Sequence, residues 1–492
     1  MKLSWIDILI VAVYLASVTA MGFFFYKRAS TSSGFATAEG KMKGWVVGFS
    51  IFGTYLSSIS FIALPGASFA EGWNRFAFSL SLPLAAWVAT RWFTRYYRRT
   101  GHVSAYASLE TRFGVWARLY AMTFYLLTQF ARVGTITFLV ALTLNSAAGW
   151  DIRMVIVVVG TLVTVYTVMG GIEAVIWTDM VQSIVLITGA VVCATILLFS
   201  MPEGPGQVFR IGMDSGKFSM GPYGLSLFHT TFWVTLVYGV FINLQNFGID
   251  QNYVQRYLAS ESQKEADRSV WFGALLYIPV SALFFFIGTE LFAYYSVFPG
   301  LLPEHLAAPG AGDKVFPHFM MTQLPTGFKG LLIAALLAAA MSTVSSSLNS
   351  SSTILMSDLY TRFLFPDADD RHKTLFLRFS SLALGFFGVI AALLMINNKS
   401  ALDQWWKLSG VFSGGMLGLF LLGIMTTRVR SAHAAVGVAA GLSVIVWASF
   451  GGTWGLPENP LHPFMTIVMG TCAIFLVGMA AAMALGKPQS RG

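Results

Sequence analysis

The chain has 492 residues, of which 56% are hydrophobic and only 11% are charged, and its formal net charge is +9. A soluble globular domain carries about a quarter charged residues, so this composition excludes an ordinary soluble protein and predicts an all-α polytopic membrane protein. The basic residues are scattered between apolar segments, which argues against nucleic acid as a partner. The expected partner is the lipid bilayer.

The apolar segments are long enough to cross a membrane as helices. A spanning helix needs about twenty apolar residues, and on this criterion we predict about thirteen transmembrane helices. Their approximate ranges are 5–26, 44–68, 75–97, 115–148, 152–170, 173–200, 226–252, 269–297, 327–360, 373–396, 403–427, 431–451 and 461–485. The loops between them are short, so a single transmembrane domain is expected over residues 1–492.

Basic residues gather in alternate loops along the chain. Those in the loops expected to be cytoplasmic are Lys27, Arg28, Lys41, Lys43, Arg91, Arg95, Arg98, Arg99, Arg112, Arg118, Arg256, Lys264, Arg268, Arg362, Arg371, Lys373, Arg378, Arg428, Arg430, Lys487 and Arg491. Cytoplasmic loops are enriched in Lys and Arg, so we expect the N-terminus outside and, after an odd number of spans, the C-terminus in the cytoplasm. Short loops without eukaryotic targeting features suggest a multi-pass protein of the cell inner membrane.

Polar residues interrupt the second predicted span at mid-length. Residues 49–66 read FSIFGTYLSSISFIALPG, with Ser57, Ser58 and Ser60 at the centre of an apolar segment. Irregular backbone at this depth is tolerated only where it lines a cavity, and interrupted spans mark the binding sites of transporters. The sequence therefore predicts a broken helix at the centre of the molecule.

A second interruption lies in the seventh predicted span. Residues 243–252 read NLQNFGIDQN and place Asn243, Asn246 and Asp250 within the span. The alternative is a helix that ends early, with these residues at the cytoplasmic surface. The two interrupted spans are five spans apart, as expected for a five-plus-five inverted repeat.

The ninth predicted span is rich in serine and threonine. Residues 338–360 read AAAMSTVSSSLNSSSTILMSDLY, and helical spacing places Ser342, Ser345 and Ser346 on or near one face, with Thr343 beside it. Oxygen ligands of this kind suit a group-one cation, whereas small residues also allow close helix packing. Because a broken helix accompanies this run, ion binding is the favoured interpretation.

Two charged residues lie inside apolar segments, where burying a charge is costly. Asp179 follows YTVMGGIEAVIWT in the sixth span, and Arg132 lies within QFARVGTITF in the fourth. Asp179 is either buried or interfacial. Arg132 is interpreted as a site for an anion, because a guanidinium group matches a carboxylate, and pairing with a buried acid is the alternative.

At these motifs the chain resembles the sodium:solute symporter family. The resemblance is carried by YTVMGGIEAVIWTDMVQ at 166–182, by DQNYVQRYL at 250–258 and by the serine-rich ninth span. It implies a leucine-transporter-like 5+5 inverted repeat. In that scheme 5–26 is an extra helix, 44–252 holds the first repeat and the broken first helix of the second, 269–427 completes the second repeat, and 431–485 forms C-terminal helices.

The resemblance also implies two sites for Na⁺, the only cofactor expected. The main site would use backbone groups and hydroxyls on both sides of the first helix break, at Gly53, Leu56, Ala339, Ser342 and Thr343. A second site, as described for the sialic acid branch of the family, would use Asp179, Ser342, Ser345 and Ser346.

The sialic acid branch is the part of the family that the chain resembles most. That resemblance implies that Ser57, Ser58 and Ser60 hold a sugar-acid carboxylate together with Arg132. The chain departs from the branch beside this site: Ser79 replaces a glutamine, Arg75 an aromatic residue and Tyr55 a threonine. The remaining candidates for contact with the solute are Ser79, Asn243 and Asn246.

We therefore expect a sodium-coupled secondary active symporter that imports a small polar solute, with sialic acid or a related sugar acid as the first candidate. A neutral sugar or a small carboxylate is the alternative. A channel would need repeated rings of charge or carbonyl groups, and a membrane-embedded enzyme would need more buried acid–base residues than Asp179 and Arg132. The chain is thus expected to be a transporter rather than an enzyme, and to work as a monomer.

Overall fold

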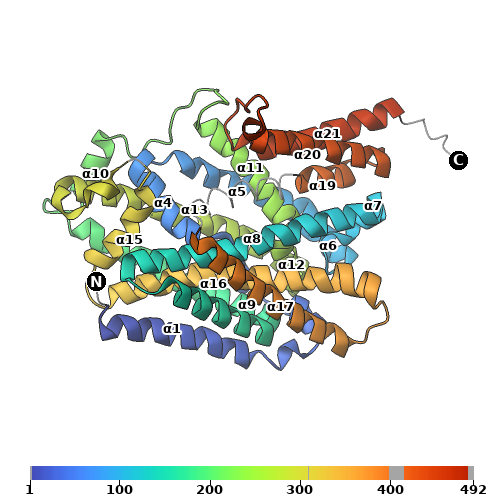
Figure 1. Ribbon diagram of the computed structural model, residues 1–492, viewed down its shortest axis with the longest axis horizontal. Coiled ribbons are helices and arrows are strands. Elements are labelled where there is room, and N and C mark those ends of the chain that lie inside the picture. Colours follow the sequence, from blue (N-terminus) through green and yellow to red (C-terminus); the bar gives the residue numbers. More distant parts are fainter. Residues whose placement is uncertain (1–2, 309, 398–414, 486–492) are drawn as a thin grey trace.

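The computed structural model describes residues 3–308, 310–397 and 415–485, and within them the chain forms helices joined by short connections. One isolated β-bridge between Met42 and Ser260 is the only strand-like pairing in the described ranges. Helices from distant parts of the sequence lie side by side in one bundle (Figure 1). The predicted all-α architecture is confirmed.

The α-helices of the described residues are α1 (Trp5–Phe24), α2 (Ser32–Thr37), α3 (Gly44–Tyr55), α4 (Ser58–Glu71), α5 (Leu82–Val88), α6 (Thr94–Thr100), α7 (Ala107–Phe113), α8 (Val115–Ala148), α9 (Ile152–Phe199), α10 (Gly206–Asp214), α11 (Phe232–Ile249), α12 (Gln251–Ala259), α13 (Gln263–Val297), α14 (Glu304–Ala307), α15 (Gly312–Thr322), α16 (Phe328–Ile354), α17 (Asp370–Leu394), α19 (Met416–Met425), α20 (Ser431–Phe450) and α21 (Met465–Leu485). Longer stretches of 3-10 or π-helix are η3 (Asn74–Ser81), η4 (Ala89–Phe93) and η6 (Leu355–Leu364).

Nine helices in the described part of the chain are long and apolar enough to cross a membrane, and the bent pair α3 and α4 makes ten. The predicted segment 75–97 is divided among η3, α5, η4 and α6, and much of 403–427 lies outside the described residues. The predicted number of thirteen spans therefore stays a prediction.

A glycine interrupts the longest helix. At about 1.5 Å per residue the 48 residues of α9 would extend about 72 Å, more than twice the thickness of a bilayer's hydrocarbon core. Gly171 has φ 57° and ψ −155°, which is not helical, and it falls between the predicted spans 152–170 and 173–200. A Cβ atom at this position would lie 2.8 Å from the Cα atom of Phe35.

Both predicted helix interruptions are present. The axes of α3 and α4 differ by 62°, and the chain between them is extended at Leu56. The Ser57 side chain begins α4 by accepting a hydrogen bond from the Ser60 backbone N–H. The second break lies between α11 and α12 at Asp250, whose side chain accepts a hydrogen bond from the Asn252 N–H at 2.8 Å.

The serine-rich helix α16 lies at the centre of the bundle. In the most apolar 18-residue stretch of the Phe328–Leu364 helix, 94% of the residues are buried. In the corresponding stretch of α1, 28% are buried. Alanine, serine and threonine let neighbouring helices approach closely on every side of such a helix. The outer helices instead expose large apolar side chains, such as Phe386 and Leu394, as expected for a surface in contact with lipid.

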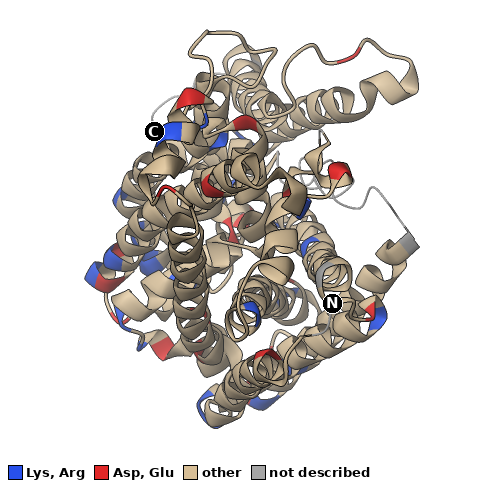
Figure 2. Ribbon diagram, turned by 90° about the vertical axis from the view of Figure 1, so that its left-hand side faces the viewer, with Lys and Arg blue, Asp and Glu red and all other residues tan. Residues whose placement is uncertain are grey.

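The bundle has two distinct ends. Helices α10 and α15 lie at one end, whereas α6 and α7 lie at the other (Figure 1). Viewed from the first end, charged residues are sparse among the helices (Figure 2).

At the other end, charged residues pair with one another. On α7, Glu110 accepts hydrogen bonds from Arg362 and Arg118, which lower the pKa of its carboxyl to about 2.

We predict that Gly171→Ala destabilises the protein. The backbone conformation at Gly171 costs other residues on the order of 1–3 kcal/mol, and the added methyl group would also collide with the Phe35 backbone. Thermal unfolding in detergent measures the loss. Gly149→Ala is the control, because Gly149 also has positive φ but no atom lies within 4 Å of its Cβ position. Equal losses in the two variants would contradict the packing argument.

Candidate functional site

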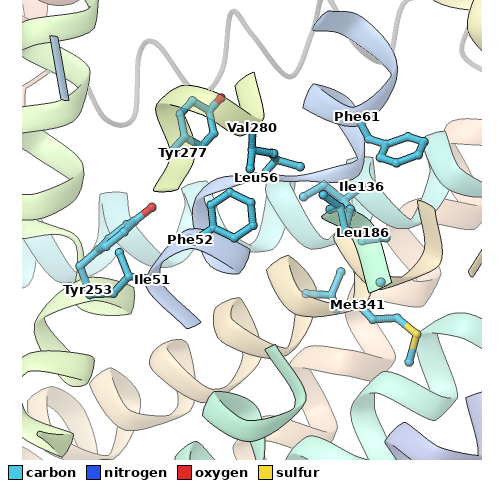
Figure 3. Packing of buried hydrophobic residues seen from close by; sticks show 14 of the residues in the cluster. Ile51, Phe52, Leu56, Phe61, Ile136, Leu186, Tyr253, Tyr277, Val280 and Met341 are labelled. Carbon is cyan, nitrogen blue, oxygen red and sulfur yellow. The ribbon is translucent and has the colours of Figure 1, made fainter. Parts of the chain in front are cut away.

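The first helix break lies at the centre of the packed core. Leu56 is fully buried, and side chains from several helices surround it, including Phe52 of α3, Tyr277 of α13 and Ile136 of α8 (Figure 3). At the end of α3 the Leu56 N–H donates to the Phe52 carbonyl at 2.9 Å, and the carbonyl groups after Phe52 lie beyond the last hydrogen bond of the helix. The break therefore offers backbone oxygens in a place that lipid does not reach.

Of the residues predicted for the main sodium site, Gly53 of α3 and Ser342 of α16 lie close to each other. A Cβ atom on Gly53 would lie 3.1 Å from Ser342 Oγ, so the α3 backbone approaches the Ser342 side chain here. Thr343 donates a hydrogen bond to the Ala339 carbonyl at 3.1 Å, and both residues are buried. No cluster of three or more His, Cys, Asp or Glu occurs in the described ranges, so hydroxyl and carbonyl oxygens are the available ligands. These are hard oxygen donors that fit a group-one cation.

Asp179 is buried rather than interfacial, with no exposed surface. Its Oδ1 accepts a hydrogen bond from Ser342 Oγ at 2.7 Å, and its Oδ2 accepts one from Ser50 Oγ at 2.5 Å. Ser345 donates to the Ser342 carbonyl at 3.0 Å, and Ser346 Oγ lies 3.0 Å from Thr54 Oγ1. The four predicted residues of the second sodium site are thus neighbours, and Ser342 joins them to the main set.

Arg256 lies inside this second set, which corrects its expected place in a cytoplasmic loop. It is 1% exposed and stands in α12, directly after the second helix break. Its Nη2 donates to Asp179 Oδ2 and to Ser346 Oγ, each at 2.7 Å. The sequence did contain a signal, because a buried Asp179 requires a positive partner and Arg256 belongs to the motif at 250–258.

The polar residues beside the first break form a second group. Tyr55 OH donates a hydrogen bond to Asn243 Oδ1, and Asn243 Nδ2 donates to Ser81 Oγ at 2.8 Å. Ser58 Oγ is buried and has no hydrogen-bond partner among the described residues. Ser60 is half-buried and lies beside Tyr277. The Ser58 hydroxyl is therefore available to a ligand, whereas the Asn243 side chain is occupied.

Arg132 and Asn246 are both half-buried, on α8 and α11. Among the hydrogen bonds of the described residues, none joins Arg132 to Ser57, Ser58 or Ser60. In the part of the chain that the structure describes, Arg132 therefore has no direct bond to the serines, and its role in binding an anion stays a prediction.

Two of the departures from the sialic acid branch lie in different surroundings. Ser79 of η3 is buried, and its Oγ lies 2.8 Å from Ser281 Oγ of α13. Arg75 is exposed and pairs with Glu71 at 3.4 Å. The Ser79 side chain therefore lies inside the helix bundle, whereas the Arg75 side chain lies on the protein surface.

The comparisons with known proteins agree with this geometry. The family model described as "Sodium:solute symporter family" matches residues 35–441. The chain is 34% identical to the sodium/sialic acid symporter SiaT of Proteus mirabilis (strain HI4320), covering 95% of this chain and 93% of the relative. It is 32% identical to the sodium/sialic acid symporter NanT of Aliivibrio fischeri (strain ATCC 700601 / ES114), covering 95% and 91%.

A solved structure has the same fold. It is the substrate-bound outward-open state of a Na⁺-coupled sialic acid symporter, which matches with a TM-score of 0.91 at 32% sequence identity and covers 99% of both chains. The expected leucine-transporter-like fold is therefore confirmed, as is the resemblance that the motifs indicated.

We predict that Tyr55→Phe destabilises the protein by about 1–3 kcal/mol, because it leaves the buried Asn243 oxygen without its donor. Chemical unfolding of the variant in sodium-free detergent measures this. Tyr106→Phe is the matched control, since the Tyr106 hydroxyl is buried without a hydrogen-bond partner in the described part of the chain. If both variants lose the same stability, the Tyr55–Asn243 bond is not the cause.

Proposed function

The chain belongs to the sodium:solute symporter family, and on that premise we propose that it imports an acidic sugar, sialic acid in the first instance, together with sodium ions. It acts as a secondary active transporter and not as an enzyme, in keeping with relatives that are symporters. A related sugar acid, a small carboxylate and a neutral sugar are the other solutes to test.

One observation carries the proposal: the break between α3 and α4 faces the hydroxyl run of α16. Gly53 lies against Ser342, and Thr54 Oγ1 of α3 lies 3.0 Å from Ser346 Oγ of α16. A sodium ion bound between these two helices would fix the position of the break. Ion binding then preorganises the serines at 57–60 for the solute.

The solute is proposed to bind on the opposite side of the break. The N-terminus of α4 presents backbone N–H groups and the positive end of a helix dipole, which favour an anion. Ser58 supplies an unpartnered hydroxyl and Arg132 a positive charge within the core.

Transport then follows from alternating access. Sodium binding stabilises the outward-open state, solute binding closes the outer side, and rocking of the helices opens the inner side to release both. The membrane potential assists, because each net positive charge moved inward gains about 2.3 kcal/mol per 100 mV. With two sodium ions and one carboxylate, the net movement would be one positive charge.

The cellular setting is also part of the proposal. We place the chain in the cell inner membrane as a monomer, with the N-terminus outside and the C-terminus in the cytoplasm. The arginine-rich helix α6 supports this orientation, and α7, which carries Arg112, lies at the same end of the bundle (Figure 1).

Uptake of labelled N-acetylneuraminic acid into proteoliposomes tests the function. We expect an inward sodium gradient to stimulate uptake, and expect Arg132→Ala and Ser342→Ala each to reduce it at least tenfold by removing the anion partner and an ion ligand. Sodium-stimulated uptake of a neutral sugar, with no effect of Arg132→Ala, would disprove the acidic substrate. An absence of sodium stimulation for every solute tested would disprove the coupling.

Thr343→Val isolates the main ion site. The variant removes one oxygen ligand at nearly constant volume, so the sodium concentration for half-maximal uptake should rise about tenfold, which corresponds to about 1.4 kcal/mol. Thr167→Val is the control, because Thr167 is also buried and also donates to the carbonyl four residues earlier, at 2.8 Å. An equal change in both variants would assign the effect to helix packing rather than to ion binding.

A further inference from the structure

The side chain of Arg256 is a cation tethered at the predicted second ion site. Its guanidinium reaches three helices besides its own: Nε donates to Ser50 Oγ of α3 at 2.7 Å, and Nη2 donates to Asp179 of α9 and Ser346 of α16. Nη1 donates to the Asn252 carbonyl within α12 at 2.5 Å. Every nitrogen of the guanidinium group is therefore held by a buried acceptor.

These contacts use the oxygens that a second sodium ion needs. Of the four residues predicted for that site, Asp179 and Ser346 bond the guanidinium directly. The second oxygen of Asp179 accepts from Ser342, and Ser345 donates to the Ser342 carbonyl. A sodium ion and the Nη2 group would thus share the Asp179 carboxylate.

Charge balance makes this sharing unfavourable. Asp179 and Arg256 form an ion pair whose side chains are 0% and 1% exposed, so the cluster is neutral and screened little by solvent. A sodium ion added to the intact pair would place two positive charges beside one carboxylate. Without the guanidinium, the same ion would neutralise a buried negative charge.

We propose that Arg256 and the second sodium ion compete for Asp179 and Ser346. The guanidinium takes the place of the ion whenever the ion is absent, and it must withdraw for the ion to bind. This inference rests on the proposed sodium coupling and adds a residue that sets the affinity of the second site. The competition keeps Asp179 neutralised in both states, so that ion release does not leave a bare buried carboxylate.

Equilibrium binding of ²²Na⁺ to the purified full-length protein in phospholipid nanodiscs tests the competition without any solute. Choline chloride keeps the ionic strength constant. Thr343→Val identifies the binding component of the main site, and Ser345→Ala identifies that of the second site, since neither side chain contacts Arg256. We expect Arg256→Gln to tighten the Ser345-dependent component at least tenfold.

Two further variants serve as controls. Arg118→Gln also removes a buried arginine, one that bonds Glu110 and Asp358 at 2.7 and 2.6 Å, and it should leave both binding components unchanged. The double variant Asp179→Asn with Arg256→Gln should lose the Ser345-dependent component, because no carboxylate remains. If Arg256→Gln does not fold, Arg256→Met replaces it, since this uncharged side chain of similar length cannot compete for Asp179.

The outcomes separate this inference from the proposed function. A Ser345-dependent component that is unchanged or weaker in the Arg256 variants overturns the competition but leaves sodium coupling intact. Tightening in the Arg118 variant as well overturns it too, because any loss of positive charge would then suffice. An absence of sodium binding in every variant overturns both proposals.

Discussion

The interaction on which the centre of the molecule depends is the buried ion pair of Asp179 and Arg256. A lone charge is very costly in a membrane interior, so each partner fixes the position of the other. Through Ser50 and Ser346 the pair also holds α3 and α16 against α9 and α12. Both broken helices are therefore anchored at one polar cluster, and the oxygens of the predicted ion sites lie around it.

The two helix breaks place different chemical groups in the core. The first, at Leu56, leaves carbonyl groups on one side and helix N–H groups on the other, so a cation and an anion find suitable partners within one turn of each other. The second, at Asp250, begins α12, and this helix carries Arg256 into the core.

Much of this arrangement is visible in the sequence, because the bilayer imposes strong rules. Helix length, the interruption at Ser57 and the hydroxyl run of α16 follow from apolar and polar patterning. The partner of Asp179 was not assigned, although the motif at 250–258 contains Arg256, because basic residues there also fit a cytoplasmic loop and only the fold shows that α12 turns inward. The Tyr55–Asn243 bond likewise joins residues far apart in the chain, and no local pattern encodes it.

The burial of α16 has a consequence for how the protein can change over time. In a helix enclosed on all sides, a larger side chain fits only if a neighbouring residue moves. Amino-acid substitutions along residues 328–354 are therefore restricted to side chains of similar or smaller size. The outer helix α1 faces lipid over most of its surface and accepts any apolar residue there. New solute preferences are therefore easier to acquire through α4, η3 and α11 around the first break than through the helix that holds the ion ligands.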